Sequence, residues 1–402
     1  MGKNKKNYIS IITIAFGFLF GLMLFPSNIK SLIIIITGIF VLVNFFQNKN
    51  TFDKKYFLSN SYYFIILLIT FLYTKDLNTA SLKVQTMISL VAFPLIFSLF
   101  NKNDKQVLIE YKFNYLWIYI IGVVLYNTIP FLWFYSIIPN YSFLGMSYHL
   151  KNFIMNNIGK YGIHPIYMSM HCCLAVLFSL KLFLSLKKKY VKILLLFLNL
   201  ILFFFILIYA RKGPIIAFLI TLVTFFYVEK RKYLKYNLLI VFGLIVLLSL
   251  IPTTRNRFLE LAKVEKMTVD DSSSSNIRYT IYKNSIILVK EAPFLGYGIG
   301  DYQQELNKLY KKNAPILLDN AYNSHNQYLG FLLIGGIILL VTFLFYFCEK
   351  FVIAFQTNNT LLILVLVFYG IAMLFENILE RENGVIFFAF FINFFSLKNS
   401  QE

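Results

Sequence analysis

The sequence predicts an all-α polytopic membrane protein, and three observations lead to this fold class. Of its 402 residues, 58% are hydrophobic and only 14% are charged. Apolar runs of about 20 residues, enough for a helix to cross a bilayer, recur from one end of the chain to the other. Charges, prolines and polar clusters bound each run, as expected for loops between membrane helices.

Twelve transmembrane helices are expected from these boundaries. They cover roughly residues 8–25, 29–46, 57–74, 79–100, 115–138, 165–185, 190–209, 213–228, 237–251, 326–347, 360–377 and 384–397. The count can differ by one, because spans 7 and 8 meet in a tight turn and span 9 is short. The chain therefore divides into nine spans over residues 1–251, a connection over residues 252–325, and three spans with a short cytoplasmic tail over residues 326–402.

The distribution of lysine and arginine predicts the orientation, because short loops rich in these residues stay in the cytoplasm. With the N-terminus inside, the inward segments hold clusters of basic residues: Lys3, Lys5, Lys6, Lys49, Lys54, Lys55, Lys102, Lys105, Lys112, Lys187, Lys188, Lys189, Lys192, Lys230, Arg231, Lys232 and Lys235. Both termini are then cytoplasmic, and the connection over residues 252–325 lies outside. The net charge of +20 is mostly a topology signal, so the expected partners are membrane lipids and not nucleic acid.

No pattern in the sequence points to a cofactor, a metal or a disulfide. Cys172, Cys173 and Cys348 all fall inside or at the edge of expected spans, without metal-ligand spacing. The first apolar segment lacks a small-residue cleavage site, so it is expected to remain as a span.

The connection over residues 252–325 is long enough to be functional, and its composition favours order. In "DSSSSNIRYTIYKNSIILVKEAPFLGYGIG" a polar cluster suits a helix start, apolar residues follow at helical spacing, and a proline and glycines end the helix. Asp301 can cap a second helix, "DYQQELNKLYKKN". We expect two amphipathic helices on the outer membrane face, joined by a turn at Gly296, Gly298 and Gly300. A phosphate-binding loop is a poor interpretation of these glycines, because no strand precedes them.

Arg211, Lys212 and Arg278 are candidates for an anion site. Arg211 and Lys212, in "LIYARKGPIIAFL", stand where span 7 turns into span 8, beside a helix N-terminus that favours an anion. An arginine at membrane depth costs about 2.5 to 3.5 kcal/mol, so it usually faces a partner or a wet cavity. Arg278 is expected in the first turn of the loop helix. A snorkelling Arg211 and a solvated Arg278 are the alternatives.

Among the four histidines, His325 is the candidate catalytic base. It begins span 10 at the end of the long connection, where Asn326 beside it and Asn323 before it can hydrogen-bond the ring and set its tautomer. The alternative is an ordinary polar helix cap. His171, in mid-span, is expected to be a hydrogen-bonded core histidine. His149 and His164 belong to the outer loop before span 6, where they line an entry path or are simply exposed.

One base and two cations on the outer face suit transfer from a lipid-linked donor. That side offers no nucleotide-sugar pool, so a transferase there needs a donor that carries its own activation, such as a glycan on a polyprenyl pyrophosphate. Guanidinium groups bind the departing pyrophosphate bidentately, which removes the need for a general acid. The acceptor hydroxyl, a poor nucleophile, benefits from a base.

The segments "ARKGPIIAF", "NIRYTIYKNSIILVKEAPFLGYGIGDY", "SHNQYLGFLLIGG" and "FENILERENGVIFFAFF" resemble the O-antigen ligase family and its Wzy-like polymerase relatives. This resemblance implies a GT-C-like membrane glycosyltransferase in a bacterial inner membrane, with a periplasmic active site. It also implies that Arg211 and Arg278 bind the pyrophosphate of an undecaprenyl-pyrophosphate-linked glycan and that His325 activates the acceptor. The ligase pattern fits at Gly336 and departs at Leu339.

Ligation of O-antigen to lipid A-core is therefore the first interpretation, and polymerisation of O-antigen or exopolysaccharide repeat units is the alternative. A protein O-oligosaccharyltransferase shares these segments. A polytopic transporter is the alternative from another class, although the chain shows no similar halves. The first outer loop, "FPSNIKS", has no acidic residue, so a metal-independent enzyme is expected.

Three glutamates, Glu376, Glu380 and Glu382, cluster with Arg381 in the turn between spans 11 and 12. Like charges this close are costly unless they are paired, and Lys212 and the loop cations are candidate partners. We expect Glu376, at the membrane end of span 11, to support the site by hydrogen bonding and not to act as a nucleophile.

Overall fold

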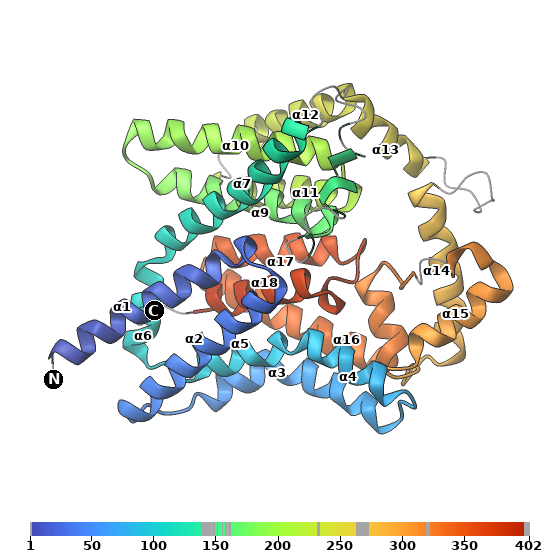
Figure 1. Cartoon of the computed structure of the whole chain (residues 1–402), viewed down its shortest axis with the longest axis horizontal. Helices are drawn as coiled ribbons and strands as arrows, with labels where there is room; N and C mark the ends of the chain where they lie inside the picture. The colour runs from blue at the N-terminus through green and yellow to red at the C-terminus, as the bar shows by residue number, and fades with distance from the viewer. Residues whose placement is uncertain are drawn as a thin grey trace.

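The computed structural model describes residues 2–137, 146, 149–150, 152–154, 156, 159, 162–230, 234–262, 273–318 and 322–397. Every regular element in these residues is a helix (Figure 1). The α-helices are α1 (Gly2–Phe20), α2 (Ser27–Gln47), α3 (Lys54–Ile69), α4 (Leu77–Met87), α5 (Ser89–Ser98), α6 (Lys102–Glu110), α7 (Lys112–Ile137), α9 (Pro165–Ser185), α10 (Lys189–Tyr209), α11 (Lys212–Lys230), α12 (Leu234–Leu250), α13 (Pro252–Ala262), α14 (Ser274–Glu291), α15 (Tyr302–Asn313), α16 (Gln327–Gln356), α17 (Thr360–Ala372) and α18 (Glu382–Phe395). Short 3-10 turns are η1 (Leu22–Leu24), η2 (Thr70–Leu72), η5 (Pro315–Leu317) and η6 (Ile378–Glu380).

Seven of the described helices are long and apolar enough to cross a membrane, or eight if the bent pair α4 and α5 is one span. Four shorter apolar helices, Ile11–Phe20, Val241–Leu250, Thr360–Ala372 and Glu382–Phe395, lie where four more spans are expected. The helical membrane character is thus confirmed, while the count of twelve spans stays a prediction.

Three expected spans differ in shape from the prediction. The span expected over residues 79–100 is bent by 43° between α4 and α5, near Pro94, which lacks the N–H for a helical hydrogen bond. α16 extends to Gln356 instead of 347 and is broken at Gly335 and Gly336. α17 ends at Ala372, so Glu376 lies in the following turn and not at the end of a helix.

The helices pack in layers around α17 and α18 (Figure 1). α17 contacts α9, α11, α16 and α18, and α18 contacts α4 and α5 on its other side. α18 is buried from Gly384 to Phe395, as expected for a helix that is apolar all round. Phe390 and Phe394 pack against Phe16 and Phe20 of α1 in tilted and edge-to-face pairs, with ring centroids 4.9 to 6.2 Å apart.

The two ends of the bundle differ. α14 and α15 lie at one end, here named the loop-helix end, on the right in Figure 1. α1 begins and α18 ends at the opposite, left-hand side, here named the terminal end.

The two loop helices form as expected, but one predicted cap is wrong. The Ser273 hydroxyl caps α14 by accepting from the Asn276 N–H at 3.3 Å. The Asp301 carboxylate does not cap α15. It accepts instead from the backbone N–H groups of Lys75 and Asp76, at 2.7 and 2.9 Å, and so attaches the loop helices to the start of α4.

The turn after α14 inserts into the break of α16. Tyr297 and Gly298 donate their N–H groups to the carbonyls of Leu333 and Ile334, both at 2.8 Å. Gly336 has a φ of +60° there, and a Cβ on it would lie 2.2 Å from the Phe294 backbone. The turn therefore does more than join two helices, because its backbone satisfies carbonyls that the break leaves free.

Candidate active site

A cavity of about 170 Å³ at the loop-helix end brings together most of the predicted site residues. α9, α11, α13, α14, the residues before α16 and the turn after α17 all contribute to its lining. The ionisable side chains in the lining are His164, Arg211, Lys212, Arg257, Arg278, His325 and Glu376. Among the predicted site residues, only Asn326 does not line it.

Arg211 reaches this cavity from the junction between two membrane helices. α10 ends at Ala210, whose left-handed backbone (φ +45°) turns the chain, and α11 begins one residue after Arg211. The Arg211 Nε is buried and has no hydrogen-bond partner in the described part of the chain. Burial and the charges of Arg257 and Arg278 lower the Arg211 pKa to about 10, so the group stays charged at neutral pH. An arginine whose buried Nε lacks a partner, beside other cations, favours an anion.

Arg257, on α13, is a cavity residue that the sequence analysis did not identify. It lies 3.5 Å from Glu260, one turn along the same helix. A usable signal exists in "PTTRNRF", because two arginines just outside span 9 run against the usual exclusion of basic residues from outer loops.

Lys212 pairs with a residue other than those predicted. Its buried ammonium donates to Glu260 Oε2 at 2.9 Å and to Ser275 Oγ at 2.7 Å. The expectation that Lys212 contacts the acidic cluster of residues 376–382 is therefore wrong, since α13 supplies a nearer carboxylate. Arg278 stands on the second turn of α14 and not, as expected, on the first, because the helix begins at Ser274. Its charge acts on Glu376.

His325 and Glu376 form a pair across 51 residues of sequence. His325 Nδ1 lies 3.2 Å from Glu376 Oε2, and the two side chains are 22% and 10% exposed. Burial raises the pKa of Glu376, but the hydrogen bond and charge of His325 and the charge of Arg278 outweigh it and hold the pKa below its usual value. A Glu376 carboxylate accepts the Nδ1–H, which leaves Nε2 as the free acceptor.

The backbone of His325 is left-handed, with a φ of +45°. This conformation costs a non-glycine residue about 1 to 2 kcal/mol, and neighbouring hydrogen bonds hold it. The Asn323 side chain accepts from the His325 N–H at 3.1 Å, the Tyr282 hydroxyl donates to the His325 carbonyl at 3.2 Å, and the Asn377 side chain accepts from the Asn326 N–H at 2.9 Å.

Asn326 does not set the ring tautomer, contrary to the prediction. Its side chain caps α16 by accepting from the N–H groups of Tyr328 and Leu329, at 2.9 and 3.1 Å, which leaves the ring to Glu376.

The remaining acidic residues of the turn face other groups. Glu380 accepts hydrogen bonds from Tyr302 and from Asn377, the latter at 2.6 Å. Neither Glu380 nor Glu382 lines the cavity. Glu376 is thus the one member of the predicted acidic cluster that reaches it.

The other histidines occupy three different environments. His164 caps α9 and lines the cavity. His171 is buried, and its Nδ1 lies 2.7 Å from the Tyr119 hydroxyl, as expected for a core histidine. His149 does not line the cavity.

The cavity lining carries an excess of positive charge beside the histidine–glutamate pair. Four cations line it, whereas Glu376 is the one carboxylate in the lining and Glu260, outside the lining, pairs with Lys212, so the surroundings favour an anion. In the described part of the chain, no group of three histidine, cysteine or acidic side chains is placed to hold a metal ion.

These features define a multi-pass helical membrane protein with a cation-lined cavity and a histidine–carboxylate pair. Residues 194–344 match the family model described as O-antigen ligase. The matched segment contains Arg211, Arg278 and His325, and it confirms the predicted resemblance to this family. A comparison with curated proteins finds no match. The family indicates a glycosyltransferase-like ligase that acts on a lipid-linked glycan and an acceptor.

Proposed function

We propose that this chain is a membrane glycosyltransferase that moves a glycan from undecaprenyl pyrophosphate to an acceptor hydroxyl at the periplasmic face of a bacterial inner membrane. Ligation of O-antigen to lipid A-core is the first choice for the reaction. One observation carries the proposal: an arginine with a buried, unpaired Nε and a histidine–glutamate pair line the same cavity.

The donor pyrophosphate binds between Arg211 and Arg278. Each guanidinium group offers two parallel N–H donors to phosphate oxygens, and the pair neutralises the charge that grows on the leaving group. Arg257 adds a third guanidinium group to the same lining. Lys212, which is already paired with Glu260, fixes α13 beside α11 and so positions Arg257.

The acceptor hydroxyl approaches His325. Nε2 takes the hydroxyl proton while the oxygen forms its bond to the anomeric carbon of the glycan. The bond between that carbon and the phosphate oxygen breaks, and the pyrophosphate keeps the electron pair. Glu376 remains a carboxylate, which orients the ring and stabilises the imidazolium that forms. No covalent glycosyl-enzyme is needed.

Repeat-unit polymerisation is the second candidate function, because the sequence departs from the ligase pattern at Leu339. Leu339 is buried in α16 and packs against Gly335, away from the cavity. The same donor site and base serve both reactions, so the acceptor decides between them.

In vitro transfer with the purified full chain tests the proposal. The chain is incubated with a glycan on undecaprenyl pyrophosphate and with either lipid A-core or a second lipid-linked repeat unit as acceptor. Glycan attached to lipid A-core supports ligation, while lengthened lipid-linked chains support polymerisation. Absence of both products contradicts the proposed function.

His325→Ala tests the base. It is expected to lower turnover by about 10² to 10⁴ and to leave donor affinity largely unchanged, because the arginines bind the pyrophosphate. His149→Ala is the matched control and keeps activity. Near-normal turnover of His325→Ala would leave His325 as a helix-start residue only, and loss of donor binding would place it in the pyrophosphate site.

A further inference from the structure

A second and larger cavity lies at the terminal end of the bundle. It has a volume of about 770 Å³ and is formed where α3 and α6 begin and where α16 and α18 end. α16 separates it from the candidate active site, because His325 precedes the first residue of this helix and the larger cavity lies at its last turns. Four lysines and two carboxylates line it: Lys55, Lys102, Lys105, Lys350, Asp53 and Glu349.

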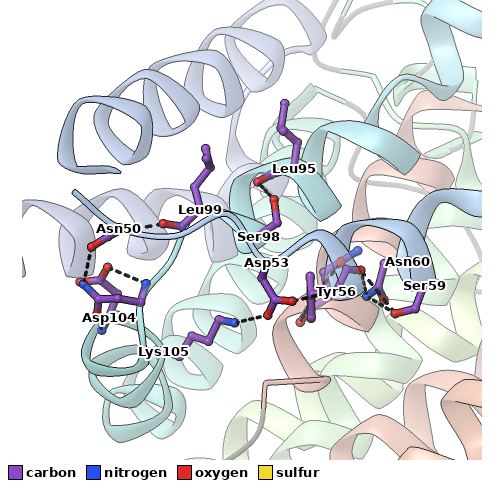
Figure 2. Close-up of polar contacts among 12 residues, drawn as sticks. Asn50, Asp53, Tyr56, Ser59, Asn60, Leu95, Ser98, Leu99, Asp104 and Lys105 are labelled. Atoms are coloured by element: carbon purple, nitrogen blue, oxygen red, sulfur yellow. Dashed lines mark hydrogen bonds and ion pairs between the residues drawn. The ribbon is translucent and has the colours of Figure 1, made fainter. Parts of the chain in front are cut away.

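The cavity is lined by two more lysines than carboxylates. Figure 2 shows Asp53 between α3 and α6, where it accepts from Lys105 Nζ at 3.2 Å and from the Tyr56 N–H at 3.0 Å. Lys55 and Lys102 are exposed and have no ion pair among the described residues. Two lysines are thus available at the cavity mouth.

Lys350 is a buried charge whose ion pair with Glu349 is long. Its side chain is 1% exposed, and the ammonium makes a long contact of 3.4 Å with Glu349 and lies 5.2 Å from the Tyr346 ring centre. Charges in membrane helices are costly and usually pair or face a polar cavity. Lys350 therefore favours an anion in the cavity that it lines.

Asn60 supplies a buried hydrogen-bond acceptor without a partner in the described residues. The residue is 2% exposed, and its Nδ2 donates to the Tyr56 carbonyl at 2.7 Å. Its Oδ1 is buried with no hydrogen-bond partner in the described residues, and it lines the same cavity. A buried acceptor without a partner costs about 1 to 3 kcal/mol, so a ligand hydroxyl is favoured there.

We propose that this cavity binds the headgroup of an anionic phospholipid. The phosphate contacts the lysines, a headgroup hydroxyl donates to Asn60, and the start of an acyl chain lies on the apolar wall of Val352 and Ile353. Phosphate is also the chemistry of a free ion, but the apolar wall favours a lipid. Basic cavities between membrane helices at the membrane surface are suited to such headgroups. The proposal is independent of the transfer reaction.

Lipid binding to the purified full chain tests this inference by native mass spectrometry in detergent. Phosphatidylglycerol is expected to bind at least tenfold more tightly than phosphatidylcholine, and an equal concentration of inorganic phosphate is not expected to displace it. Equal binding of the two lipids, or displacement by phosphate, would overturn the proposal.

Matched lysine variants locate the binding. Lys55→Gln with Lys102→Gln is expected to weaken phosphatidylglycerol binding by about 25-fold, since each basic residue near a membrane surface contributes about fivefold. The control is Lys187→Gln with Lys189→Gln, which removes the same charge from exposed residues just before α10 and at its first position, outside the cavity. Equal weakening in both double variants, or in neither, would show that the lipid does not bind in this cavity.

Discussion

Replacing Arg211 separates a pyrophosphate ligand from a snorkelling membrane-interface arginine. Arg211→Lys keeps the positive charge but loses the planar fork of two N–H donors. A hydrogen bond to a charged group is worth about 1.5 to 3 kcal/mol. Loss of one of two such bonds predicts a fall in kcat/KM of about 10- to 150-fold. Arg211→Gln loses both bonds and the charge, so its fall is expected to be about 10²- to 10⁴-fold.

The stability of Arg211→Gln is not expected to fall with its activity. Arg211 is disfavoured in the free protein, because burial and the charges of Arg257 and Arg278 oppose its own charge and lower its pKa to about 10. Removing the charge in Arg211→Gln relieves this repulsion. The midpoint of thermal unfolding is therefore expected to be no lower than that of the wild type.

The assay is transfer from the lipid-linked donor at varied donor concentration, with thermal unfolding of the same samples. Arg255→Gln is the matched control, because Arg255 is an exposed arginine on α13 that does not line the cavity. It is expected to keep both activity and stability. Full activity in Arg211→Lys would refute the pyrophosphate role, and a lower unfolding midpoint in Arg211→Gln would give Arg211 a structural role instead.

Three further predictions address the base, the break in α16 and the topology. Glu376→Gln is expected to lower kcat by about 10² with donor KM unchanged. The variant is also expected to be less stable than the wild type: this deficit is full above about pH 4.3 and vanishes as pH falls through the lowered pKa of Glu376. A trapped glycosyl adduct on Glu376 would contradict its supporting role. Gly336→Ala is expected to destabilise the protein by more than about 2 kcal/mol, because the added Cβ would lie 2.2 Å from the Phe294 backbone. Gly243→Ala is the neutral control in the same thermal unfolding measurement, because a Cβ there meets nothing within 4 Å. A reporter fused after residue 270 should be periplasmic and one after residue 232 cytoplasmic, and the reverse result would remove the proposed compartment.

The positions of the helices could be predicted from the sequence, because membrane insertion depends on local apolar length. Every described membrane-length helix overlaps an expected span. The lysine pattern likewise led to a common outer end for Arg211, Arg278 and His325, and the structure places them around one cavity. Such predictions need only the composition of each segment and the order of the segments.

The partners of these residues could not be predicted, because they come from distant parts of the chain. Lys212 pairs with Glu260, and the His325 ring with Glu376, across 48 and 51 residues. Adjacency in the sequence predicts that Asn326 bonds the ring. The left-handed backbone at His325 instead directs the Asn326 side chain to the helix start, and no periodicity signals that conformation.

The break in α16 explains how a loop helix can carry part of an active site. α14 is attached to α16 at two places: near the cavity by Tyr282 and the His325 carbonyl, and at the break by Tyr297 and the Leu333 carbonyl. Arg278 and His325 therefore belong to one packed unit, while Arg211 belongs to the junction of α10 and α11. The cavity lies between these units, and guanidinium groups from each repel one another across it. An anion placed between them would remove that repulsion, so the proposed pyrophosphate donor would turn an arrangement that is unfavourable in the free protein into a favourable one.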